Sequence, residues 1–209
     1  MNIDHTLQVE LPWAWRQAFL AINPGGNLPV LQLDNHMVLC GTYPISEYLA
    51  EQATQTEADG ALAPLFPGDI EERAEARRLV DWFHVKCHRE VTQDLLYEKH
   101  YARAAGVPGH SPDSEVLIAT TQNLKQHMRY IGFLCDYRRW LAGDEMSFAD
   151  LAAAGHMSCL DYLGVIDWDK YPSARDWYVR MKSRRSFLDI LDDRVPGLAP
   201  PVHYADPDF

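Results

Sequence analysis

The feature that most constrains the fold is a change in hydrophobic periodicity after the first fifty residues. Three short runs indicate strands, at residues 6–11, 29–33 and 37–40, the last two joined by a segment of hairpin length. Residues 15–22 indicate a short helix, and Thr42 is placed to cap another. Beyond residue 68 the apolar residues recur at helical spacing only. The chain is therefore expected to join a small mixed α/β part to an all-helical part.

Breaks in this pattern divide the chain further. Residues 53–68 contain two prolines without any period, which is typical of a linker. Asp69 and Glu72 have the spacing of a capping box and predict the start of the first long helix. The tail, residues 194–209, has four prolines and no core period, so we expect it to contribute little to the fold. Helices are predicted at residues 69–95, 114–141, from 147, 172–181 and 187–191.

Composition excludes several classes of protein. The 209 residues include 19 Lys and Arg against 30 Asp and Glu, a net charge of -11. Such a field repels phosphate backbones and anionic lipids, so we expect neither nucleic acid nor membrane partners. Four separated cysteines without a CxxC pair, and a start without the basic and apolar segments of a secretory signal, indicate reduced thiols in a cytoplasmic protein.

Motifs spread over nearly the whole chain resemble the glutathione transferase-like family. Residues 23–31, NPGGNLPVL, are similar to its turn and strand, in which the residue before a cis proline faces glutathione. Residues 140–150 are similar to its WLAGD and SxAD segment, and residues 172–187 to its C-terminal helices. The resemblance implies an α+β chain with a thioredoxin-like N-terminal domain and an all-α C-terminal domain. The implied boundaries are a partial thioredoxin-like domain at 1–52, a linker at 53–68, a helical domain at 69–193 and a tail at 194–209.

Other segments resemble one group within that family, whose members bind FtsZ filaments in bacterial cell division. The similar segments are residues 10–13, 73–82, 90–92, 97–99, 192–197 and 203–209. The resemblance implies a non-catalytic adaptor that binds FtsZ, forms a homodimer and works in the cytoplasm at the division site. The alternative within the family is a glutathione-dependent transferase. A third is a transferase-like protein with another target.

Two departures from the family pattern bear on catalysis. Family members begin with a further strand and helix that carry the thiol-activating residue, so this chain is expected to be N-terminally truncated, with no catalytic residue present. The family's acidic-Ser pair, which binds the glutamyl end of glutathione, is Gly41-Thr42 here. Leu28, Pro29 and Thr42 would line the glutathione-like cleft. Because the acid is absent, we expect no cofactor, and glutathione remains the alternative.

The same resemblance proposes residues for the partner site. Aromatic side chains are typical interface anchors, and the tail joins two of them to acidic residues. The predicted partner-binding residues are Trp13, Glu98, Tyr204, Asp206, Asp208 and Phe209. Each has a simpler interpretation: packing for Trp13, a solvated helix position for Glu98 and an unstructured ending for the tail.

Two further patterns are more simply structural. His84, Cys87 and His88 share one predicted helix, and a His pair four residues apart can bind zinc. No third ligand has suitable spacing, so we expect a solvated face and no metal. Ser147 and Asp150 resemble a nucleophile and an acid, but their spacing is that of a capping box. The sequence contains no GxSxG, GxGxxG or P-loop motif.

Overall fold

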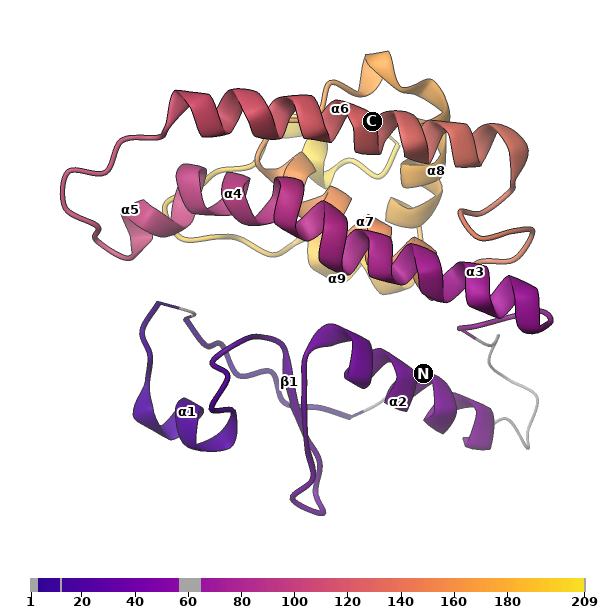
Figure 1. Ribbon diagram of the computed structural model, residues 1–209, viewed down its shortest axis with the longest axis horizontal. Coiled ribbons are helices and arrows are strands. Elements are labelled where there is room, and N and C mark those ends of the chain that lie inside the picture. The colour runs from indigo at the N-terminus through magenta and orange to yellow at the C-terminus, as the bar shows by residue number, and fades with distance from the viewer. Residues whose placement is uncertain (1–3, 12, 57–64, 209) are drawn as a thin grey trace. The chain divides into compact units, whose positions relative to one another are not determined.

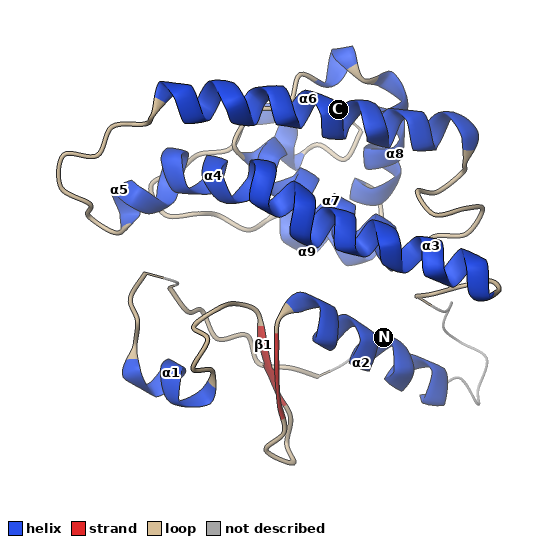
Figure 2. Ribbon diagram, in the orientation of Figure 1, coloured by secondary structure: helices blue, strands red, loops and turns tan. Residues whose placement is uncertain are grey.

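The computed structural model describes residues 4–11, 13–56 and 65–208, and the side chains of 53–56 are outside that description. The chain divides into two units, residues 1–65 and residues 66–209, each of which has its own internal packing (Figure 1). The first holds the short strands, and the second is built from helices and loops in its described part (Figure 2). Among the described helices, none is long and apolar enough to cross a membrane.

The first unit contains one hairpin and two helices among its described residues. Helix α1 is Gln17–Ile22, strands β1 and β2 are Val30–Gln32 and Val38–Cys40, and helix α2 is Thr42–Thr56. The strands are antiparallel, with Val30 opposite Cys40 and Gln32 opposite Val38. Helix α2 continues into the segment expected to be a linker, and residues 57–64 lie outside the described residues.

One predicted strand is absent from the described part of this unit. Residues 6–11 form neither helix nor strand, although apolar and polar residues alternate in their sequence. Leu7 is 84% exposed and Val9 is 81% exposed. Alternation marks residues that can pair in a sheet, but pairing also needs a neighbouring strand. The described residues supply none beside this segment, so the strand prediction is wrong.

Local hydrogen bonds fix the turn before the hairpin. The buried Asn23 side chain donates from Nδ2 to the carbonyl oxygen of Asn27 at 2.7 Å, and its Oδ1 accepts from the Gly25 N–H at 3.1 Å. Gly26 adopts φ +68, and an added Cβ there would lie 3.1 Å from the Trp15 ring. A side chain is therefore disfavoured at Gly26 both by the backbone conformation and by space.

The helical unit begins with a long helical stretch that changes type along its length. Helix α3, Ile70–Asp81, is followed by π-helix η2, Trp82–Thr92, short helix α4, Gln93–Leu96, π-helix η3, Tyr97–Tyr101, and short helix α5, Ala102–Ala104. The predicted capping box is confirmed at its start, because the Glu72 N–H donates to Asp69 and the Asp69 N–H donates to Glu72. The predicted core face is confirmed too, with Leu79, Phe83, Cys87 and Val91 fully buried.

The remaining helices include two that pack against this stretch. The remaining helices are α6, Ser114–Tyr137, α7, Phe148–Tyr162, α8, Pro172–Lys182, and α9, Arg185–Leu191, with 3₁₀ helices η4, Trp168–Lys170, and η5, Val202–Ala205. Helix α6 lies along η2 and α4, and α7 packs on α3 and η2 (Figure 1). The core between them includes Trp177, Met128, Ile131, Leu141 and Met157, all fully buried.

Helix α6 ends earlier than the sequence analysis predicted. Arg138 is extended, with φ -136 and ψ 150, so the helix stops at Tyr137 and not at Leu141. The Arg138 guanidinium donates to the carbonyl oxygen of Leu141 and to Glu75, both at 2.8 Å. The Leu141 N–H donates to Asp150 Oδ1 at 3.0 Å. These contacts give the polar groups of the segment partners outside a helix, and the chain can therefore leave α6 early.

Candidate functional site

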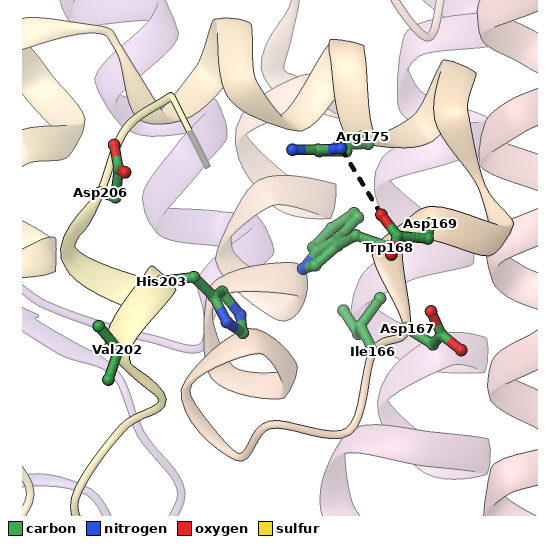
Figure 3. A pocket seen from close by; sticks show the side chains of 8 residues that line it. All are labelled: Ile166, Asp167, Trp168, Asp169, Arg175, Val202, His203 and Asp206. Atoms are coloured by element: carbon green, nitrogen blue, oxygen red, sulfur yellow. Dashed lines mark ion pairs between the residues drawn. The ribbon is translucent and has the colours of Figure 1, made fainter.

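A cavity of about 590 Å³ lies where the tail meets the helical unit (Figure 3). Its floor contains Ile166 and Trp168, both nearly buried. Arg175 of α8 reaches toward Asp169, 3.7 Å from guanidinium nitrogen to carboxylate oxygen. The other lining residues are Asp167, Val202, His203 and Asp206. Acidic groups therefore surround an apolar floor, with one guanidinium among them.

The tail forms one wall of this cavity because it is packed against the helices. Tyr204 is 2% exposed, its ring is 5.0 Å from that of Tyr162, and its hydroxyl lies 2.9 Å from Ser158 Oγ. The Tyr162 hydroxyl donates to the carbonyl oxygen of Leu198 and accepts from the Val195 N–H, each at 2.9 Å. The expectation that the tail contributes little to the fold is wrong. Sequence patterning does not reveal the burial of Tyr204, because a single aromatic residue in a short 3₁₀ helix produces no repeating apolar pattern.

The predicted tail residues have different environments. Tyr204 points into the core of its own chain, which leaves its ring unavailable as an anchor for a partner in this conformation. Asp206 and Asp208 are exposed, and the Asp208 N–H donates to Asp206 Oδ1 at 2.9 Å. Phe209 lies outside the described residues. Of the described residues in this group, only Asp206 lines the cavity.

Glu98 holds a loop in place and does not sit on a solvated face. Its side chain is 9% exposed, and its carboxylate accepts from the Asp113 N–H at 2.9 Å. The same carboxylate is 3.6 Å from His110 Nε2. Asp113 is in turn the N-cap of α6, accepting from the Glu115 N–H. Glu98 therefore positions the start of α6, and it does not line the cavity at the tail.

The glutathione-like residues lie in the first unit. The Leu28-Pro29 peptide bond is cis, as the resemblance implied, and both side chains are exposed. Thr42 is the first residue of α2, after Gly41 with φ +91, so the helix begins at Thr42 itself and not after it. Trp13, also in this unit, is half-buried.

His84, His88 and His156 gather between η2 and α7. His84 Nδ1 is 3.4 Å from His156 Nε2, and the Thr92 hydroxyl is 2.9 Å from His156 Nδ1. His84 is half-buried and His88 is exposed, so the predicted solvated face holds for His88 alone. Burial, reinforced by neighbouring histidines, lowers the pKa of His156 to about 3. Among the described residues, no three His, Cys, Asp or Glu side chains are placed to hold a metal ion.

The capping box of α7 is confirmed. Asp150 Oδ2 accepts from the Ser147 N–H at 2.9 Å, and Ser147 Oγ accepts from the Ala149 N–H at 3.3 Å. Asp150 Oδ1 also accepts from the Trp177 indole at 2.9 Å. Burial raises the pKa of Asp150, although these hydrogen bonds oppose that rise. The pair is fully engaged in structure, which leaves it no role as nucleophile and acid.

Comparison with known proteins identifies the class. Residues 1–52 match the family model of the glutathione S-transferase N-terminal domain, and residues 99–185 match that of the C-terminal domain. The sequence is 43% identical over 200 residues to FtsZ-localized protein A of Caulobacter vibrioides, covering 94% of this chain and 84% of that protein. The chain belongs to the glutathione S-transferase family.

Solved structures of glutathione S-transferase-like proteins are similar to this chain in both fold and sequence. The structure of FzlA from C. crescentus has a TM-score of 0.87 and 41% identity, covering 97% of this chain and 87% of that one. A glutathione S-transferase from Sinorhizobium meliloti 1021 has a TM-score of 0.87 and 45% identity, covering 96% and 86%. The glutathione transferase-like fold expected from the sequence is therefore confirmed.

Proposed function

We propose that this protein is a non-catalytic adaptor that binds FtsZ filaments in bacterial cell division. The observation that carries the proposal is the 43% identity to FtsZ-localized protein A over 94% of the chain. FtsZ is the proposed partner, and the cytoplasm at the division site is the proposed location. The resemblance in the tail, noted from the sequence, supports the same assignment.

The cavity at the tail is the proposed contact surface. Asp206 and Asp208 are exposed and lie next to Tyr204, which is held in the core. A segment fixed in this way loses little conformational freedom when a partner binds, so more of the contact energy remains as affinity. Trp13 and Phe209 stay as further predicted contacts, whereas Glu98 would act through the loop that it holds.

Co-sedimentation with polymerised FtsZ tests the function and the surface together. The intact chain should pellet with polymers. Replacing Asp206 and Asp208 together by Ala should weaken the affinity for FtsZ by at least about tenfold. A tenfold change in affinity corresponds to about 1.4 kcal/mol of binding free energy. Asp189→Ala, another exposed aspartate, is the matched control. An intact chain that stays in the supernatant contradicts the proposed function, and an unaffected double variant contradicts the surface alone.

We also propose that the protein works as a homodimer, which presents the same surface twice. Phe133 and Tyr137 are 57% and 78% exposed on α6, with ring centroids 5.1 Å apart. Exposed paired aromatics are typical anchors of protein interfaces. Two linked sites gain avidity on a polymer without tight single contacts.

Sedimentation velocity tests the dimer. Replacing Phe133 and Tyr137 by Ala should convert dimer to monomer, whereas Ile118→Ala, also exposed on α6, should not. A wild-type chain that sediments as a monomer at micromolar concentration contradicts the dimer. A double variant that remains dimeric contradicts this surface only.

The alternative function is glutathione-dependent transfer, which the match to both glutathione S-transferase domain models supports. We nevertheless propose that the adaptor needs no glutathione, because Gly41 offers no carboxylate to balance the glutamyl ammonium. The chain should show no conjugation of a standard electrophile above the buffer rate. Turnover that a glutathione analogue abolishes would favour the alternative.

A further inference from the structure

A single buried carboxylate connects the walls of the tail cavity. Asp161, at 1% side-chain exposure on α7, accepts through Oδ1 from the Trp168 indole at 2.8 Å and lies 2.9 Å from His203 Nε2. Its Oδ2 is 3.7 Å from Lys182 Nζ of α8. Trp168 is part of the floor of the cavity and His203 is part of its tail wall. Helix α7, η4, α8 and the tail therefore meet at one group.

Lys182 completes this connection. Its side chain is fully buried, and its ammonium donates to the carbonyl oxygen of His203 at 3.2 Å. The same ammonium lies 5.6 Å and 5.7 Å from the ring centroids of Tyr178 and Tyr204. Burial lowers the pKa of Lys182, and the Asp161 carboxylate opposes that shift. The cation therefore touches both a side chain of α7 and the backbone of the tail.

Apolar packing alone would not require these charges. A buried ion pair contributes little net stability compared with apolar residues of similar volume, but removal of one partner leaves an uncompensated charge in the interior. Tyr204 supplies apolar anchoring, whereas the contact of the Asp161 carboxylate with His203 Nε2 and the hydrogen bond that Lys182 donates to the His203 carbonyl are directional. Directional bonds fix the register of a short segment, which burial of one ring does not do.

We propose that Asp161 and Lys182 are positioning residues for the partner surface: they fix the tail in one register, so that Asp206 and the cavity walls are presented together. This inference rests on the proposed binding of FtsZ through the tail. Neither residue lines the cavity, so neither would touch the partner. Their effect on binding would pass through His203 and Trp168.

Charge variants of the full chain test the inference. Asp161→Asn and Lys182→Met each leave one buried charge without its partner. The double variant removes both charges, and its new side-chain amide at position 161 can still accept a hydrogen bond. Lys182→Arg is the conservative control that keeps the cation. Two measurements are needed for each variant: amide hydrogen exchange of residues 202–206 compared with α6, and co-sedimentation with FtsZ polymers.

Each single variant should raise exchange in residues 202–206 and weaken FtsZ binding by more than about tenfold, while α6 keeps its protection. The double variant leaves no charge unpaired and should fold as the wild type does, but its residues 202–206 should still exchange faster and its FtsZ binding should still be weaker, because the ammonium that donates to the His203 carbonyl is gone. Lys182→Arg should resemble the wild type more than Lys182→Met does. A loosened tail in a double variant whose α6 keeps its protection separates positioning of the tail from the general cost of an unpaired buried charge. If a single variant does not fold, the double variant alone still decides.

Contrary results are distinct for the two claims. Exchange in residues 202–206 that is unchanged in both single variants, or that returns to the wild-type rate in the double variant, overturns the inference even if the wild type binds FtsZ. If exchange responds as expected but the wild type does not pellet with polymers, the proposed function falls and the partner-positioning role with it. Loosened tails that bind FtsZ with unchanged affinity also overturn the positioning role.

Discussion

Burial differs sharply between the two units of the chain. All of the largest fully buried side chains among the described residues lie in the helical unit, with Trp177, Tyr178 and Phe83 among them. In the first unit the buried residues of the described part are Phe19, Asn23 and Ser46. Its two strands span three residues each, and an isolated two-stranded hairpin is at best marginally stable.

The two units are therefore stabilised by different kinds of interaction. The helical unit is held by apolar burial together with buried polar hubs at Asp150 and Asp161. The first unit relies on local features, such as the Asn23 hydrogen bonds and Gly26. Substitutions in the helical unit should therefore change global stability, whereas those in the described part of the first unit should have local effects.

The largest effect is expected at Asp150. Asp150→Ala orphans the buried Leu141, Ser147 and Trp177 N–H groups, and each buried donor left unpaired costs about 1–3 kcal/mol, so we expect a loss of about 4 kcal/mol or more. Urea denaturation measures this loss. Asp144→Ala, an exposed neighbour, is the control. A loss below about 1 kcal/mol is no more than a substitution on the surface produces, and it would contradict the role of Asp150 as a buried hydrogen-bonding hub.

Tyr204→Ala should come next, with a loss of about 3 kcal/mol, as expected for truncating a large buried aromatic. Val202→Ala should be nearly neutral, because Val202 is fully exposed two residues away. Thermal unfolding followed by circular dichroism compares the two variants. Equal melting temperatures would mean that the tail is not part of the helical core.

A smaller effect should appear with pH at the histidine cluster. Burial holds the pKa of His156 near 3, below its unfolded value of about 6.5, so the unfolded chain takes up the proton first. The contribution of the neutral, buried His156 to the free energy of unfolding is therefore present above pH 6.5 and is lost as pH falls toward 3. His156→Gln should reduce the slope of unfolding free energy between pH 6.5 and 5 by up to about 1.4 kcal/mol per pH unit.

The control for this slope is His36→Asn in the hairpin, where asparagine tolerates the φ of +66. The window stops at pH 5 because ion pairs with Arg78 and Arg138 hold the pKa of Glu75 at about 2, and that carboxylate loses its contribution as pH falls below about 4.5. If the unfolding free energy of His156→Gln and of the wild type changes with pH by the same slope, the histidine cluster is not the source of this pH dependence.

The smallest effect is expected in the first unit. Leu7→Ser should change the unfolding free energy by less than about 0.5 kcal/mol, because the side chain is 84% exposed. Leu79→Ala, at 0% exposure on α3, should lose about 2–5 kcal/mol. Urea titrations of both variants under one set of conditions measure the contrast. Comparable losses would show that the two units do not differ in the way that burial indicates.

Local chemistry made several features predictable from the sequence. The capping boxes at Asp69 and Ser147 depend on residues three positions apart, so sequence spacing is enough to find them. The core face of Leu79, Phe83, Cys87 and Val91 follows from the sequence, but a steady spacing of four residues does not by itself distinguish an α-helix from a π-helix. Leu79 lies on the α-helix α3, whereas from Trp82 to Thr92 the structure is a π-helix, whose wider turn suits that spacing.

Features that depend on distant partners were missed. Asp161 and Lys182 meet only because α7 and α8 pack together, and Tyr204 is buried only because the tail returns to α7. One signal was present: Asp161 follows Ala154, Met157 and Ser158 on the buried face of its helix, where a charge requires a partner. The partner's identity is a property of the tertiary fold, which sequence spacing does not contain.

Hydrogen exchange of the intact chain, with and without FtsZ polymers, tests the central claim most directly. Binding at the tail cavity should bring new protection to residues 166–169 and 202–206, the floor and tail wall of the cavity, with little change in the β1–β2 hairpin. Protection confined to the hairpin and α2, or no protection at saturating FtsZ, would contradict it.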